Sequence, residues 1–402
     1  MELKKIVFFM LATLLILTGC TGKAQSGEEN IVKIGALHPL SGGLANEGQE
    51  MRDAARLAVK EVNEAGGIKS LGGAKVELIE ADHEGAPEKG MSEIQRLDRE
   101  KVVGVIGAYS SGVTLPATQE AERAGIPFVV DIATVEEVTE RGFKYTFRVQ
   151  PPASMMAENF LEYFDVLNEM SETPLETVVL VHEDSVFGTS IASLIEKGAS
   201  DHQIDVLDNI PHAATAADIS STINKINRLK PDAVIATTYL RDGTLLVNGL
   251  NQSNFQPKVI IGVANGAFSN TAFINDETDI NQHIMDVNYS INPQSELALE
   301  VSQKYEDQFN KHMGPNAAYS YTATKVLIDA VERAGSTDRA KIQEALSETN
   351  LTEHILPQDT IVFDESGQNA NAQAVLNQII NGETKVIYPD EYKNADPVLP
   401  TK

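Results

Sequence analysis

The chain has 402 residues, a formal net charge of −26, one cysteine and no tryptophan. Such an acidic surface repels nucleic acid and anionic lipid headgroups. A single cysteine excludes an intramolecular disulfide and a cysteine-based zinc site. About 370 residues follow the N-terminal segment, more than one hydrophobic core usually supports, so we expect two lobes.

The N-terminus carries a secretory pattern. Two lysines precede an apolar run over residues 6–17, which is too short to span a bilayer and predicts a signal peptide over residues 1–19. Leu17-Thr18-Gly19-Cys20 resembles the lipobox of bacterial lipoproteins, so we expect cleavage before Cys20 and lipid on its thiol. Residues 20–30 would then form the lipidated cysteine and a flexible tether. The alternative is an ordinary cleaved signal with an incidental cysteine.

Strand and helix patterns alternate along the rest of the chain. The strand patterns cover residues 31–37, 75–81, 102–108, 126–132, 177–181, 233–238 and 258–263. The helical patterns cover residues 49–65, 87–99, 114–124, 155–167, 189–199, 219–229, 244–252, 295–312, 317–334 and 338–347. Alternation with short links predicts parallel sheets flanked by helices. Because the pattern restarts after Pro151-Pro152, we expect two doubly wound lobes.

Candidate binding residues follow the strands, since ligands of open α/β sheets bind beyond the carboxyl ends of the strands. Ser110-Ser111-Gly112 lies between a strand and a helix, where free N–H groups and the helix dipole favour a carboxylate. Helix capping by serine is the alternative interpretation. Thr134-Val135-Glu136-Glu137 fits a capping box, which is compatible with ligand binding nearby.

Several kinds of chemistry are disfavoured. His182-Glu183-Asp184 has no further histidine at metal-ligand spacing. The segment around Ser111 lacks a nucleophile elbow, and Gln49 replaces the lysine of a phosphate-binding loop. We therefore expect no metal, no cofactor and no catalysis. A hydrolase that uses Ser110 or Ser111 with His182 as base is the enzymatic alternative.

Short motifs occur in a particular order along the chain. They are Ile34-Gly35-Ala36-Leu37-His38-Pro39-Leu40-Ser41-Gly42, Glu64-Ala65-Gly66-Gly67-Ile68, Val105-Ile106-Gly107-Ala108-Tyr109-Ser110-Ser111, Gly125-Ile126-Pro127, Ala133-Thr134, Val138-Thr139-Glu140-Arg141-Gly142 and Phe187-Gly188. Together they resemble the Leu/Ile/Val-binding proteins, the type I solute-binding proteins of branched-chain amino-acid ABC transporters. The resemblance covers essentially the whole mature chain.

The resemblance implies a type I periplasmic-binding-protein fold, in which two lobes joined by a three-strand hinge close around a ligand. It places the crossovers near Arg148, Val287 and the region of Gln358. The expected lobes comprise residues 31–148 with 287–357, and residues 149–286 with 358–402.

The resemblance also implies roles for individual residues. Ser111 resembles the serine that binds a ligand α-carboxylate, and Ala133 and Thr134 resemble contacts to the carboxylate and ammonium. Tyr239 matches an aromatic residue of the second lobe, and Phe187 stands where the family often has tyrosine. The expected ligand-binding residues are Tyr109, Ser110, Ser111, Ala133, Thr134, Asp184, Phe187, Tyr239, Arg241 and Asn265.

One segment departs from the family pattern. Where amino-acid binders commonly place an acid for the ammonium, this chain reads Ala264-Asn265-Gly266. A buried ammonium without a counter-charge is costly. Either Glu183 or Asp184 supplies that charge, or the ligand is not an α-amino acid. Arg241 would favour an additional ligand anion, unless it is a solvated surface residue.

The expected function is that of an extracytoplasmic solute-binding protein with a lipid anchor at the cell membrane. It would capture an amino acid or a related small carboxylate and deliver it to the permease and ATPase subunits of an ABC importer, acting as a monomer with no nucleic acid partner. The alternative is a ligand-sensing module of the same fold that signals to a partner protein.

Overall fold

The computed structural model describes residues 31–274 and 284–399. The expected signal peptide, Cys20 and the tether therefore lie outside the described residues. Within the described part of the chain, none of the helices combines the length and the apolar character needed to cross a bilayer.

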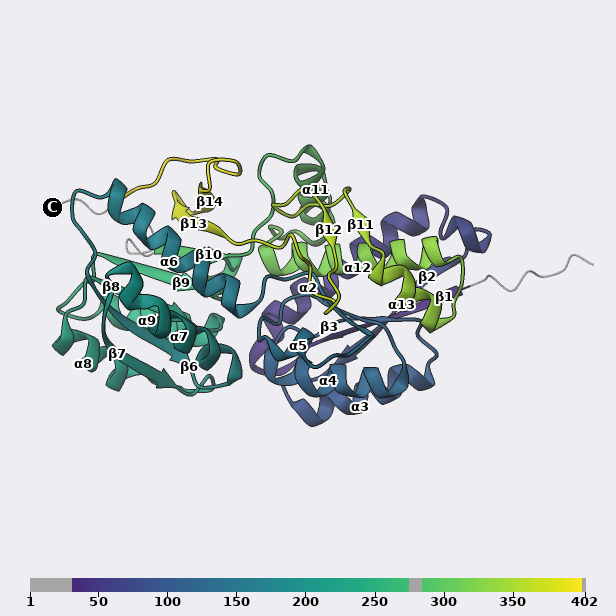
Figure 1. Cartoon of the computed structure of the whole chain (residues 1–402), viewed down its shortest axis with the longest axis horizontal. Coiled ribbons are helices and arrows are strands. Elements are labelled where there is room, and N and C mark those ends of the chain that lie inside the picture. The colour runs from purple at the N-terminus through teal and green to yellow at the C-terminus, as the bar shows by residue number, and fades with distance from the viewer. Residues whose placement is uncertain (1–30, 275–283, 400–402) are drawn as a thin grey trace, which may run out of the picture. The chain divides into compact units, whose positions relative to one another are not determined.

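The first sheet contains five parallel strands in the order β2-β1-β3-β4-β5. They are β1 (Ile31–His38), β2 (Lys75–Asp82), β3 (Val105–Gly107), β4 (Phe128–Val130) and β5 (Thr146–Arg148). Strands β1, β2 and β3 of this sheet are labelled in Figure 1. The three short strands β3, β4 and β5 are buried at every position, as expected for a parallel sheet covered on both faces.

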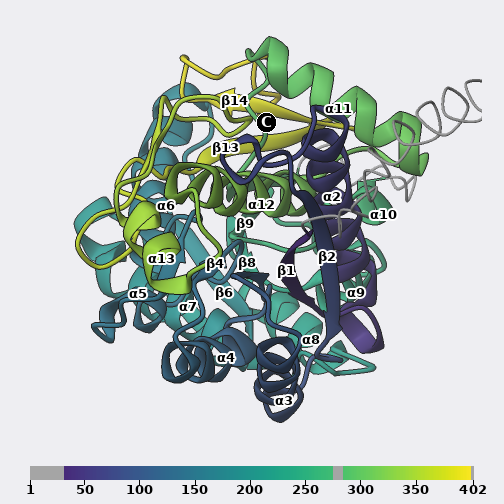
Figure 2. The same ribbon diagram turned by 90° about the vertical axis from the view of Figure 1, so that its right-hand side faces the viewer.

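Helices pack against this first sheet. They are α2 (Ala45–Glu64), α3 (Pro87–Arg99), α4 (Ser111–Ala124), α5 (Glu137–Glu140), α12 (Pro315–Ala334) and α13 (Arg339–Ser347). Helix α12 comes from far along the chain and lies beside α2 (Figure 2). Ala54, Ala55 and Ala58 of α2 are completely buried, and such small side chains allow a close helix–helix approach.

The second sheet has seven strands in the order β14-β13-β10-β9-β8-β6-β7. They are β6 (Thr177–Glu183), β7 (Asp205–His212), β8 (Ala233–Thr237), β9 (Val259–Val263), β10 (Ile284–Asn288), β13 (Val375–Ile380) and β14 (Glu383–Tyr388). Helix α6 (Ala153–Met170) precedes the first strand of this sheet, and α7 (Val186–Gly198), α8 (Ser220–Leu229), α9 (Leu240–Asn251) and α10 (Thr271–Ile274) follow its parallel strands in turn. Helix α11 (Glu296–Phe309) comes after the last parallel strand, β10. A small antiparallel pair, β11 (Asn350–Leu351) with β12 (Ile361–Val362), stands apart.

The expected parallel sheets are confirmed, but the second sheet carries an antiparallel addition beyond its five parallel strands that we did not predict. Strands β13 and β14 form an antiparallel hairpin whose loop is Asn381-Gly382, with both residues at positive φ. Asn-Gly is the pair that a two-residue hairpin turn of this kind prefers. The turn was therefore visible in the sequence, but the strand patterns on either side of it were not recognised.

Both sheets share one topology. If the parallel strands of each sheet are numbered along the chain, each sheet has the order 2-1-3-4-5. The strand order reverses between β1 and β3 in the first sheet and between β6 and β8 in the second. A doubly wound sheet binds its ligands at this reversal, beyond the carboxyl ends of the strands.

The chain passes between the two sheets after β5, after β10 and after β12. Two of these crossing segments pair directly, because the backbone N–H of Arg148 donates to Gly367 and that of Asn369 donates to the Arg148 carbonyl. The third is tied to them through the N–H of Asn292, which donates to Ile355. The lobe boundaries that we assigned from the sequence remain a prediction.

Candidate functional site

A central cavity of about 300 Å³ lies where the two sheets face each other. It is lined by Tyr109, Ser111, Ile132, Ala133, Thr134, Phe187, Tyr239, Ala264, Gly266 and Tyr289. These residues follow β3 and β4 of the first sheet and β6, β8, β9 and β10 of the second. The cavity therefore lies at the strand ends where doubly wound sheets bind ligands.

The structure brings six of the ten expected ligand-binding residues to this cavity: Tyr109, Ser111, Ala133, Thr134, Phe187 and Tyr239. The other four lie elsewhere. Ser110 is buried beside Ser111 but is not part of the lining, and Asp184 and Arg241 are exposed. Their roles as ligand contacts remain predictions.

Asn265 is the fourth of these residues, and its side chain forms hydrogen bonds within the protein. Its Nδ2 donates to the Ala236 carbonyl at 3.0 Å and to Thr238 Oγ1 at 2.8 Å, and its Oδ1 accepts from the N–H groups of Ala267 and Phe268. Its hydrogen-bonding capacity is therefore used within the protein. Asn265 shapes the turn that places Ala264 and Gly266 in the cavity lining.

Two hydroxyl groups in the cavity lining have no partner. Ser111 is 1% exposed and Thr134 is 2% exposed, yet neither Ser111 Oγ nor Thr134 Oγ1 forms a hydrogen bond. Ser111 is the first residue of α4, and the side chain of Ser110 does not cap this helix. Hydroxyls and helix N–H groups that lack partners can bind an anion such as a carboxylate.

The predicted capping box at Thr134 does not form. Helix α5 begins at Glu137, its N-cap is Glu136, and no side chain caps it. The carboxylate of Glu136 instead accepts a hydrogen bond from the N–H of Ser154 at 2.5 Å. The Thr134 hydroxyl is thus left free to face the cavity.

Aromatic side chains close the cavity from both sheets. The Tyr109 and Tyr239 ring centroids are 5.8 Å apart, and those of Phe187 and Tyr239 are 5.3 Å apart. A Cβ atom at Gly266 would lie only 2.8 Å from the Tyr109 hydroxyl, so a larger residue there would force Tyr109 to move. This lining suits a ligand with an apolar side chain.

Four lining residues were not among our ten: Ile132, Ala264, Gly266 and Tyr289. The first three lie in strand-end segments that the sequence had already nominated, residues 131–134 and 263–266, so only Tyr289 was missed altogether. Tyr289 follows β10, a strand that we did not predict. Its ring packs edge-on against Tyr319, with centroids 5.0 Å apart, and its hydroxyl donates to Asn316 Oδ1. Recognising residues 284–288 as a strand would have nominated the residue that follows it.

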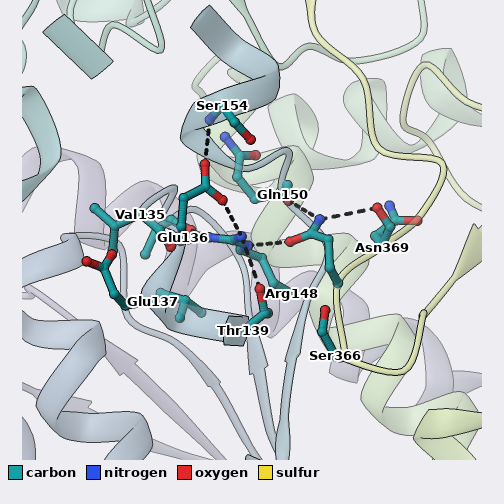
Figure 3. Close-up of polar contacts among 12 residues, drawn as sticks. Val135, Glu136, Glu137, Thr139, Arg148, Gln150, Ser154, Ser366 and Asn369 are labelled. Carbon is teal, nitrogen blue, oxygen red and sulfur yellow. Dashed lines mark hydrogen bonds and ion pairs between the residues drawn. The ribbon is translucent and has the colours of Figure 1, made fainter. Parts of the chain in front are cut away.

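The loop that carries Ala133 and Thr134 is held by Arg148 (Figure 3). The guanidinium donates to the carbonyls of Val135 at 2.6 Å and Ala133 at 3.3 Å, and to Gln368 Oε1 at 2.6 Å. It also donates to Thr139 Oγ1. Burial lowers the pKa of Arg148 to about 10, although the charge of Glu136 opposes this shift. One buried cation thus joins two crossing segments to the cavity loop.

A smaller side cavity of about 240 Å³ adjoins the central cavity and shares Gly266 and Tyr289 with it. Glu50 of α2 lines the side cavity. Burial, together with the charge of Glu47, raises the pKa of Glu50 to about 7. Glu47 lies one turn earlier on α2, and burial likewise raises its pKa to about 7. Two carboxyl groups with raised pKa values therefore lie close to the central cavity.

Within the described residues, the serine of the central cavity has no base beside it. A serine nucleophile needs a base within hydrogen-bond reach. Ser111 Oγ has no partner among the described residues, and Nδ1 of His182 faces the carbonyl of Glu183 instead.

The comparisons with known proteins agree with this architecture. The model of the periplasmic binding protein family matches residues 31–383. Leu/Ile/Val-binding protein homologs 7 and 8 of Brucella abortus are each 27% identical, over 92% and 89% of this chain and 94% and 91% of their own lengths.

Two solved structures have the same fold. The branched-chain amino acid transporter substrate-binding protein LivJ of Streptococcus pneumoniae, in complex with isoleucine, has a TM-score of 0.78 at 23% identity, covering 89% of this chain and all of its own. The leucine-binding protein LivK of Thermotoga maritima has a TM-score of 0.77 at 22% identity, covering 88% of this chain and 97% of its own. The chain belongs to the periplasmic binding protein family.

Proposed function

We propose that this protein binds an amino acid with an apolar side chain in the central cavity and delivers it to an ABC importer. The observation that carries the proposal is the pair of buried, unpartnered hydroxyls of Ser111 and Thr134 at the strand ends. Leaving a buried polar group unpaired costs about 1–3 kcal/mol, and a bound carboxylate would remove that cost. The aromatic rings around the cavity would cover the apolar side chain.

The relatives support the same class of ligand. One solved structure contains isoleucine, and another, from Desulfitobacterium hafniense, is a complex with Leu. In this proposal the two sheets with their helices close over the ligand, and the importer recognises the closed form. The protein itself performs no chemistry on the ligand.

A ligand screen tests this proposal. The purified protein, unfolded and refolded to remove any bound ligand, is expected to gain thermal stability with leucine, isoleucine or valine but not with arginine or glutamate. Ser111→Ala should lower the affinity by about 10-fold or more, because the carboxylate loses a charge-assisted hydrogen bond. Ser110→Ala, beside it but outside the lining, is the matched control. The absence of stabilisation by every amino acid would contradict the proposal.

We also propose that the mature protein is monomeric and is anchored to the extracytoplasmic face of the cell membrane through lipid on Cys20. The support is the signal pattern and the lipobox-like Leu17-Thr18-Gly19-Cys20. Two or more acyl chains give stable anchoring, whereas one is marginal. Labelled palmitate should enter the unaltered protein in cells and be absent from Cys20→Ala.

A further inference from the structure

An amino acid in the central cavity would bring an ammonium group into a lining that contains no carboxylate. The lining residues are neutral, and an ammonium removed from water needs a counter-charge. Glu183, which we considered for this role, is not part of the lining, and its carboxylate accepts hydrogen bonds from Ser185 Oγ at 2.6 Å and from the N–H of Gly188 at 2.7 Å. Asp184 is exposed.

Glu47 is a buried acid near the end of the first sheet at which a ligand is expected to bind. It lies in the first turn of α2, which follows β1, and β1 neighbours β3 in the sheet. Ser111 begins the helix that follows β3. Glu47 and Ser111 therefore stand on either side of the point where the strand order of the first sheet reverses, which is where a doubly wound sheet receives its ligand.

Glu47 is not itself among the lining residues of the central cavity, but it interacts with three residues that are. Its negative charge acts on the hydroxyls of Tyr109, Tyr239 and Tyr289, all of which line the central cavity. Burial raises the pKa of Glu47, and the backbone N–H groups of Glu47 itself and of Leu240, the first residue of α9, oppose this shift. Glu47 thus interacts with a helix of the second sheet as well as with its own helix.

One oxygen of Glu47 lacks a partner. Glu47 is 1% exposed, and its Oε1 forms no hydrogen bond. Three other buried acids near the cavities are paired: Asp131 with His38, Asp242 with His212, and Asp286 with Asn288 and Ser269. Glu50 of the side cavity forms no side-chain hydrogen bond, but its carboxylate oxygens are less completely buried than Glu47 Oε1. Within residues 31–274 and 284–399, Glu47 Oε1 is the carboxylate oxygen that is buried without a hydrogen bond.

We propose that Glu47 Oε1 pairs with the ammonium of the ligand, so that Glu47 makes the cavity select amino acids over acids that lack an amino group. This inference rests on the proposed function, because it assumes that the carboxylate of the ligand lies at Ser111 and Thr134. The ligand would then span the reversal point, with its carboxylate after β3 and β4 and its ammonium toward the start of α2.

The electrostatics of the site give this pairing a pH dependence. Burial raises the pKa of Glu47 to about 7, and the nearby charge of Asp242 on α9 adds to the effect. The other groups that interact with it are Glu50 on α2 and the three tyrosines, whose pKa values are raised above the ordinary value. Because an ammonium stabilises the ionised form, leucine affinity should be constant above pH 7 and fall as Glu47 becomes protonated at lower pH.

The test compares leucine with 4-methylpentanoate, which has the same carbon skeleton and carboxylate but no amino group. Isothermal titration at pH 8 is expected to show that Glu47→Gln weakens leucine binding by about 10- to 100-fold and leaves 4-methylpentanoate affinity unchanged. The ratio of the two affinities should therefore fall, and the leucine affinity of Glu47→Gln should no longer depend on pH between 6 and 8. Glu47→Asp should recover part of the ratio.

Glu50→Gln is the matched control, since Glu50 is a buried acid on the same helix with a similarly raised pKa but lines only the side cavity. It should keep the leucine preference. Circular dichroism and thermal unfolding of each variant separate misfolding from lost recognition. An unchanged affinity ratio in Glu47→Gln would overturn this inference alone, whereas failure of the unaltered protein to bind leucine or any other amino acid would overturn the proposed function as well.

Discussion

Two sets of buried polar groups lie close together at the edge of the central cavity. The guanidinium of Arg148 donates four hydrogen bonds, to Ala133, Val135, Thr139 and Gln368. The hydroxyls of Ser111 and Thr134 and the Oε1 of Glu47 form none. Buried polar groups are normally paired, because an unpaired one costs stability. The paired set therefore stabilises the protein, and in our proposal the unpaired set is where the ligand binds.

Removing Arg148 should have the largest effect on stability. Arg148→Met keeps much of the side-chain volume but leaves the Ala133 carbonyl and Gln368 Oε1 without a donor. The Val135 carbonyl is left with the Val138 N–H alone. Breaking a buried charged network in this way costs about 3–5 kcal/mol. Urea denaturation of the ligand-free protein should show this loss in the free energy of unfolding.

Arg141 offers the control for this substitution. It also donates four hydrogen bonds, to Glu137, Leu115, Thr118 and Val138, but it is only partly buried. Water can replace some of these bonds, so Arg141→Met should cost about 1 kcal/mol. Equal losses in the two variants would mean that burial does not set the contribution of Arg148.

The acids of α2 should show the opposite effect, a gain in stability when their charge is removed. Glu50 has no side-chain hydrogen bond to lose, and burial raises its pKa from 4.5 to about 7. The charges of Glu47 and Asp53 raise this pKa further, whereas Lys311 lowers it. Because the folded state holds its proton more tightly than the unfolded state, the stability contributed by Glu50 is present below pH 4.5 and is lost as the pH rises through 7.

Glu50→Gln removes this pH-dependent loss. The free energy of unfolding of the variant should therefore match that of the unaltered protein near pH 4 and exceed it by about 1–3 kcal/mol at pH 8. Denaturant titrations of both proteins at the two pH values measure the difference. A constant difference across this range would show that Glu50 has an ordinary pKa in the folded protein.

Much of the fold could be predicted from the sequence because the signals were local. Each predicted helix and strand has a counterpart in the structure, and the helix predicted over residues 87–99 has the observed bounds Pro87–Arg99. Strands β7 and β14 were missed because their exposed and polar positions give no continuous apolar pattern. Strands β5 and β10 were missed because Thr146 and Arg148 in the first, and Asp286 and Asn288 in the second, interrupt the apolar run that identified the equally short strands β3, β4, β8 and β9.

The candidate site was harder to predict, because a strand end indicates position but not which way a side chain points. The rule nominated both Ser110 and Ser111, yet only Ser111 lines the cavity. It nominated Asn265, whose amide bonds to its own turn instead. Glu47 lies on a helix beyond the strand end. Its place near the second sheet is apparent only from its interaction with Leu240, which is distant in the sequence.

Thr134 allows the smallest and most selective test of the difference between paired and unpaired groups. Its matched control is Thr146, whose hydroxyl is also buried and unpartnered but does not line the cavity. Because neither hydroxyl has a hydrogen bond to lose, Thr134→Val and Thr146→Val should both leave the stability of the ligand-free protein unchanged or slightly raised. Only Thr134→Val should weaken leucine binding, by about 1 kcal/mol in isothermal titration. Equal leucine affinity in the two variants would show that an unpaired buried hydroxyl at this cavity does not mark a ligand contact.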